Sequence, residues 1–79
     1  MITCYVLINV ESKHEEQVFK ELYALKEVEG IQEVFGQYDI IIKTSAENIT
    51  TLRKQVIEKI RGVRGVLHST TLITAEGGR

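Results

Sequence analysis

The chain of 79 residues suits one domain, and 43% of its residues are hydrophobic, which is enough for a single core. Its 10 basic and 11 acidic residues leave a net charge of −1, without the basic excess of a dedicated nucleic-acid binder. A single cysteine, Cys4, excludes an intramolecular disulfide. Because the sequence also lacks a signal peptide and an apolar run of membrane length, we predict a cytoplasmic protein.

The first part of the chain predicts a strand and then a helix. Residues 1–10, MITCYVLINV, are β-branched and aromatic, and both alternating sets of side chains are largely apolar. From residue 12 the apolar residues take helical spacing. Ser12 and Glu15 have the spacing of a capping box, and Gly30 marks the expected end of the helix. The apolar stripe of this helix consists of Val18, Phe19, Leu22 and Leu25.

The rest of the chain predicts two strands, a second helix and a last strand. Residues 31–35 and 40–44 are apolar segments on either side of a turn at 36–39. Ser45 is expected to cap the second helix. The buried face of that helix repeats at helical spacing, at Ile49, Leu52, Val56 and Ile60. Residues 66–74 predict the last strand. Residues 1–75 then form one domain in the order β-α-β-β-α-β, and 76–79 form a flexible tail.

This order predicts an α+β fold of the ferredoxin-like type, with a four-stranded antiparallel sheet and two helices on one face. A weak internal repeat supports two halves of similar size, because residues 28–34 and 60–66 share the pattern apolar-X-Gly-apolar-X-X-Val. The other face of the sheet would carry apolar side chains that no helix covers. We therefore predict that two copies pack sheet against sheet as an isologous dimer, an association of the dimeric α/β-barrel type.

The turn formed by Gly36, Gln37, Tyr38 and Asp39 allows two interpretations. The first is a two-residue hairpin turn, in which Gly36 supplies backbone freedom and Asp39 hydrogen-bonds nearby amides. The second is a binding site, in which free backbone N–H groups hold a carboxylate and Asp39 holds an ammonium group. An α-amino acid carries these two charges close together. The spacing alone leaves both interpretations open.

The last strand contains His-Ser-Thr-Thr at 68–71, which places Ser69 and Thr71 on one face. Such hydroxyl groups commonly accompany strand propensity, and the alternative is a polar rim that binds a small zwitterion. His14 and His68 lie far apart in the sequence without a cysteine pair, so we predict no metal, no cofactor and no catalytic residue. A basic cluster near the end of the second helix is expected to be solvated, and it consists of Lys54, Lys59, Arg61 and Arg64.

With these residues in place, the whole chain resembles the effector-binding RAM domain of the Lrp/AsnC, or feast/famine, transcription regulators. Val28 precedes Gly36 by eight residues, and Gly36, Tyr38 and Asp39 fill the Gly-X-Tyr-Asp turn of that family. Gly65-Val66 is followed by spaced hydroxyl residues, with serine at the first position, where the family more often has threonine. The resemblance covers residues 1–75. We expect no helix-turn-helix domain before the first strand, so the chain resembles a stand-alone version of the domain, and a fragment of a longer regulator is the alternative.

The resemblance implies a domain that dimerises through its sheets, with dimers joining into octamers or decamers. It also implies a small effector, usually an amino acid, bound at contacts between subunits and near the glycine turn. The implied ligand-binding residues are Gly36, Gln37, Tyr38 and Asp39, with Ser69 and Thr71 as additional contacts. The chain would not bind DNA directly, would not associate with a membrane, and would modulate full-length Lrp/AsnC regulators.

Two other functions are compatible with this sequence. One is a small dimeric ferredoxin-like enzyme of the monooxygenase or isomerase type, for which only His68 is a candidate base. An enclosed cavity lined by His68 would favour that function. The other is a structural oligomerisation domain, in which Asp39 simply caps its turn. We expect a regulatory module that is not an enzyme, because the helix stripes resemble a plain aliphatic core.

Overall fold

The computed structural model describes residues 1–74, so residue 75 and the tail predicted at 76–79 lie outside the described residues. The strands are β1 (Ile2–Val10), β2 (Val28–Glu33), β3 (Ile40–Ala46) and β4 (Val66–Ile73). The first helix is α1 (Glu15–Tyr23). The second runs through three consecutive segments, α2 (Ile49–Thr51), the π-helical η1 (Leu52–Ile57) and α3 (Glu58–Arg61).

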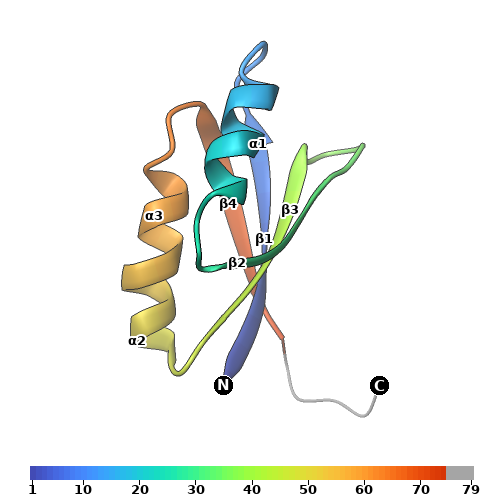
Figure 1. Cartoon of the computed structure of the whole chain (residues 1–79). Coiled ribbons are helices and arrows are strands. Elements are labelled where there is room, and N and C mark those ends of the chain that lie inside the picture. Colours follow the sequence, from blue (N-terminus) through green and yellow to red (C-terminus); the bar gives the residue numbers. More distant parts are fainter. Residues whose placement is uncertain (75–79) are drawn as a thin grey trace.

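The four strands form one antiparallel sheet in the order β2-β3-β1-β4, and both helices lie on one face of it (Figure 1). This arrangement confirms the predicted ferredoxin-like α+β fold. In the part of the chain that the structure describes, no helix has the length and hydropathy needed to cross a membrane.

The core lies between this sheet and the two helices. In β1 the buried side chains are Cys4, Val6, Ile8 and Val10, which alternate with the half-buried Tyr5, Leu7 and Asn9. The period of two therefore separates the core-facing side chains of β1 from those on its other face. The helices supply Val18, Leu22, Leu52, Val56 and Ile60, each at most 3% exposed. Burial of one such aliphatic side chain stabilises the fold by roughly 1.5–3 kcal/mol.

The sheet face opposite the helices, the uncovered face, is only partly apolar. Its apolar side chains follow from the strand register, because residues paired across strands share a face. They are Tyr5, Leu7, Ile41 and Leu72. The register places Lys43, Asn9, His68 and Thr70 on the same face. The predicted bare face therefore exists, with a polar border around an apolar centre.

The first helix begins later and ends earlier than predicted. Its N-cap is His14, with no side-chain cap, because Lys13 has a φ of 73° and the chain reverses between Ser12 and the helix. The capping box expected at Ser12 and Glu15 is therefore wrong. Helix α1 ends at Tyr23, and Gly30 lies in β2 rather than at a helix end.

The second helix is capped by Asn48, whose Oδ1 accepts a hydrogen bond from the Thr51 amide at 2.8 Å. The cap predicted at Ser45 is wrong, because β3 extends to Ala46 and pairs there with Ile2 of β1. Ile49, expected to be buried, is 48% exposed in the first turn. The π-helical segment instead brings Ile57 into the core next to Val56.

Among the described residues, Thr44 is the one buried polar side chain. Its hydroxyl donates to the Glu27 carbonyl at 2.6 Å and so attaches the α1–β2 connection to the sheet. The same connection is held by Lys59 of α3, whose Nζ lies 2.5 Å from Glu27 Oε2. That hydrogen bond lowers the pKa of the Glu27 carboxyl below its usual value.

We expect Thr44→Val to destabilise the protein by about 1–2 kcal/mol, because valine keeps the shape but leaves the Glu27 carbonyl without its partner. Urea denaturation followed by circular dichroism measures this loss. An unchanged denaturation slope would show that the fold is retained. A stability equal to that of the wild type would mean that the hydroxyl contributes nothing.

Candidate functional site

The predicted Gly-Gln-Tyr-Asp turn belongs to a six-residue connection, the 34–39 loop, between β2 and β3. It is therefore not a two-residue hairpin turn. Strand β2 is an edge strand, so the loop joins the edge of the sheet to its centre. Three hydrogen bonds fix it. Val34 N–H donates to the Asp39 carbonyl (3.0 Å), Asp39 N–H to the Ile8 carbonyl (2.9 Å), and Asn9 Nδ2 to the Gln37 carbonyl (2.6 Å).

Asp39 has a structural contact of its own. Its Oδ2 accepts a hydrogen bond from the Val10 amide at 2.8 Å, at the point where the register between β1 and β4 shifts. Asp39 therefore hydrogen-bonds a backbone amide, as expected, but this amide belongs to strand β1 and not to the turn. Between described residues, Oδ1 accepts no hydrogen bond, so one carboxylate oxygen stays available.

The tip of the loop exposes unpaired backbone amides. Gly36 has a φ of 125°, a conformation that favours glycine. Between described residues, the N–H groups of Gly36, Gln37 and Tyr38 donate to no protein acceptor. Successive free amides of this kind form a local anion-binding concavity. The loop can therefore offer donors to a carboxylate next to the Asp39 carboxylate.

The six ligand-binding residues predicted from the sequence fall into two groups. Gly36, Gln37, Tyr38 and Asp39 lie together in the loop, and Tyr38 Oη lies 3.3 Å from Thr70 Oγ1 on the uncovered face. Ser69 and Thr71 pair with Ile8 and Val6 and so share the helix-covered face.

Sequence analysis missed Asn9 and Thr70, which hold the loop in place. Asn9 lies between the buried Ile8 and Val10, and Thr70 lies between the half-buried Ser69 and Thr71, but this alternation becomes useful only once the strand register is known.

An acidic hollow lies beside the loop, with a volume of about 280 Å³. Its carboxylates are those of Glu15, Glu33 and Asp39, and its apolar walls are Val34, Phe35 and Ile40. The described residues contain no group of three or more acidic, histidine or cysteine side chains placed to hold a metal ion. The negative charge therefore suits an ammonium group, which a carboxylate binds through charge-assisted hydrogen bonds.

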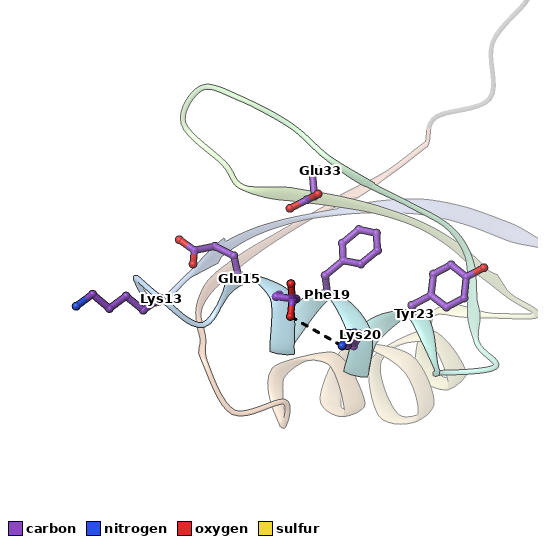
Figure 2. Close-up of a pocket in the computed structure, with 7 residues that line it drawn as sticks. Lys13, Glu15, Phe19, Lys20, Tyr23 and Glu33 are labelled. Carbon is purple, nitrogen blue, oxygen red and sulfur yellow. Dashed lines mark ion pairs between the residues drawn. The ribbon is translucent and has the colours of Figure 1, made fainter.

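The hollow continues into a larger depression of about 690 Å³ along α1 (Figure 2). Glu15 and Glu33 line both. In Figure 2, Phe19 and Tyr23 project from α1 toward the strand that carries Glu33. Their rings stack with centroids 6.3 Å apart, and Tyr23 is 70% exposed while Phe35 at the loop is fully exposed. We call Phe19, Tyr23 and Phe35 the aromatic surface. Exposed aromatic residues of this kind are enriched at protein interfaces.

His68, the candidate base of the enzyme hypothesis, is exposed near the start of β4. It lines an open hollow of about 300 Å³ with Arg61, Ser69, Val66 and Leu67. As formed by residues 1–74, this hollow is open and is not the enclosed cavity that would favour an enzyme.

The fold and the loop together define a small α+β domain of the ferredoxin-like class. A family model described as "Lrp/AsnC ligand binding domain" matches residues 3–76. The chain therefore belongs to the Lrp/AsnC ligand-binding domain family.

Relatives with known sequences are mostly regulators. An uncharacterised HTH-type transcriptional regulator of Pyrococcus furiosus is 29% identical over 75 residues, which cover 91% of this chain and 50% of that protein. This chain thus spans about half the length of the curated regulators it matches. A homocitrate synthase of Sulfolobus acidocaldarius is 37% identical over 54 residues, which cover 68% of this chain and 11% of that enzyme.

Solved structures share the fold. AsnC of E. coli superposes with a TM-score of 0.88 at 27% identity, over 96% of this chain and 52% of that one. A transcriptional regulator of Neisseria meningitidis, solved as a complex with L-Met, gives a TM-score of 0.83 over 95% of this chain and 50% of that one. Because its identity is 12%, that likeness shows the fold alone.

Proposed function

We propose that this domain is an oligomeric effector-sensing module that binds a small amino acid at the 34–39 loop and modulates Lrp/AsnC transcription regulators. The observation that carries the proposal is the juxtaposition of free loop amides with the carboxylate of Asp39 and the acidic hollow. The amides suit the carboxylate of an amino acid, and the hollow suits its ammonium group. Membership of a ligand-binding domain family supports the same conclusion.

The proposal includes assembly between copies of the chain. The apolar centre of the uncovered face supports a dimer that packs sheet against sheet. The aromatic surface next to the loop supports further contacts between dimers, in octamers or decamers, that close the effector site. Ser69 and Thr71 lie on the helix-covered face. In this proposal they contact the effector only as residues of a neighbouring subunit.

The proposed partners follow from this assembly. The domain would act in the cytoplasm by joining helix-turn-helix relatives in mixed oligomers. Direct contact with DNA is not part of the proposal, because the net charge of −1 provides no basic footprint.

Asp39→Asn tests the effector site. Asparagine keeps an oxygen that accepts from the Val10 amide but removes the charge, so the loop stays in place. We expect the affinity for the effector to fall about tenfold or more, since a charge-assisted hydrogen bond to the ammonium group is lost. Calorimetry against the standard amino acids identifies the ligand and measures the change.

Glu47→Gln is the matched control, because it removes the same charge at an exposed position outside the acidic hollow. Equal weakening in both variants would contradict a specific role for Asp39. The absence of binding heat for every amino acid at millimolar concentration would overturn the sensing function and leave a structural oligomerisation domain.

A further inference from the structure

A groove lies between the second helix and strand β4, on the helix-covered face of the sheet. Its volume of about 260 Å³ lies just below the roughly 300–1,000 Å³ typical of ligand pockets. Its walls combine aliphatic side chains with two guanidinium groups and one hydroxyl. The lining residues are Ile49, Leu52, Arg53, Ile57, Arg61, Thr71 and Ile73, which together we call the arginine groove.

The helical wall of the arginine groove is irregular. The segment Leu52–Ile57 is π-helical, and the Glu58 amide donates to the Arg53 carbonyl, five residues earlier. Such segments are rare, and they occur frequently at functional sites. The wider helical turn of this segment brings Ile57 toward the core, while Arg53 and Arg61 still line the groove. The irregularity therefore coincides with the groove.

The charge in the groove is of one sign. Between described residues, neither Arg53 nor Arg61 takes part in an ion pair, and no carboxylate of residues 1–74 lines the groove. Arg61 Nε donates to Ser69 Oγ at 3.2 Å, a neutral contact that holds the side chain beside β4 without neutralising it. Two uncompensated guanidinium groups next to apolar walls are complementary to an anion that carries an apolar body.

We propose that the arginine groove binds a small aliphatic carboxylate that lacks an ammonium group, such as a branched α-keto acid. Arg53 and Arg61 hold the carboxylate, and Thr71 hydrogen-bonds one of its oxygens or the keto group. Ile49 and Ile73, which are 48% and 47% exposed in the free domain, cover the aliphatic part. A zwitterionic amino acid is disfavoured, because its ammonium group would face two guanidinium groups and no carboxylate.

This site goes beyond the proposed function. Arg53, Arg61 and Thr71 come from one subunit and from the helix-covered face, whereas Tyr38 of the loop contacts the uncovered face. The chain would thus distinguish an amino acid from its keto-acid counterpart at two sites that share only Thr71, which contacts the effector as a residue of a neighbouring subunit. The groove needs no second copy of the chain to be complete.

The test is a titration of the full chain with α-ketoisocaproate. Calorimetry measures the affinity, and the chemical shifts of backbone amides show where the ligand binds. We expect a dissociation constant on the order of a millimolar, because both arginine side chains are partly screened by water. Leucine has the same carbon skeleton with an ammonium group, and acetate has the carboxylate without the aliphatic body. Each should bind in the groove at least about tenfold more weakly.

Arg53→Gln and Arg61→Gln should each weaken α-ketoisocaproate binding about tenfold. Lys54→Gln and Arg64→Gln remove the same charge from neighbouring positions outside the groove, and they should leave the affinity within about twofold. Asp39→Asn should also leave the affinity for α-ketoisocaproate unchanged, because Asp39 lies in the effector loop and not in the arginine groove.

Three results would overturn the proposal. They are equal weakening in all four charge variants, binding of leucine or acetate in the groove as tight as that of the keto acid, and no shift of groove amides at millimolar keto acid. Loss of amino-acid binding in Asp39→Asn with intact keto-acid binding would support both sites. Intact keto-acid binding without any amino-acid binding would remove the proposed function alone.

Discussion

Gly65→Ala is expected to remove a large part of the stability of this domain. Gly65 precedes β4 and has a φ of 103°, a conformation that an L side chain rarely adopts. A Cβ atom there would lie 2.6 Å from Val18 Cγ2 and 3.3 Å from His14 Cβ. Val18 is fully buried, so it has little room to move. The Gly65 carbonyl also accepts a hydrogen bond from the Glu11 amide at 2.8 Å, which restricts movement of the backbone at Gly65.

Backbone strain of about 1–2 kcal/mol and overpacking of about 1–3 kcal/mol together predict a loss of roughly 2–5 kcal/mol. A small domain has only about 5–15 kcal/mol in total. The melting temperature should therefore fall by roughly 15–30 °C. Thermal and urea denaturation at one fixed protein concentration measure the loss, since assembly makes stability depend on concentration.

Gly36→Ala is the matched control for this prediction. Gly36 also has a positive φ, of 125°, but a Cβ atom there has no neighbour within 4 Å. Alanine at this position should therefore destabilise the protein only through backbone strain, by about 1–2 kcal/mol. If both substitutions destabilised the protein equally, the contact with Val18 would not be the cause.

Leu7→Lys is expected to convert the proposed assembly into monomers. Leu7 lies at the centre of the uncovered face, opposite Ile41 of β3 and Thr70 of β4. In a sheet-to-sheet dimer each subunit would bury one unpaired ammonium group, at several kcal/mol per ion. The dissociation constant of the dimer should rise about a thousandfold or more. In the free monomer the new side chain can reach water, so the fold should be retained.

Sedimentation equilibrium over a dilution series distinguishes these states. Gln55→Lys adds the same charge at an exposed position of the second helix and should leave the assembly unchanged. A wild-type chain that is monomeric at micromolar concentration would contradict the proposed dimer. A Leu7→Lys chain with wild-type mass would show that the contact lies elsewhere on the molecule.

Residues that alternate or repeat along the chain were predicted well. Val6 and Ile42 lie opposite each other in the core, and Val18 and Leu22 face them from α1, as their periods of two and 3.6 indicate. Helix ends were predicted poorly. The segment at 45–48 contains Ser45 and Asn48, both good N-caps, and pairing of β3 with β1 as far as Ala46 decides for Asn48.

The 34–39 loop likewise has features that the sequence predicts and features that it does not. Its glycine, aromatic ring and carboxylate are visible in the sequence, and they predict a turn with free amides near a negative charge. The partners of those groups are not visible there. Asp39 bonds the Val10 amide, and Tyr38 lies against Thr70, across separations of 29 and 32 residues. Ser69 and Thr71 were predicted to bind the same ligand as the loop. They lie instead on the helix-covered face, where Ser69 accepts a hydrogen bond from Arg61.

The sequence by itself therefore determined the fold class, the composition of the core and the position of the loop, because these depend on local period and turn chemistry. Only the tertiary structure decided which face each polar residue shares, where the carboxylates and the arginines gather, and which glycine has no space for a side chain. These properties depend on strand register and helix packing, which bring together residues whose separation in the chain carries no local signal.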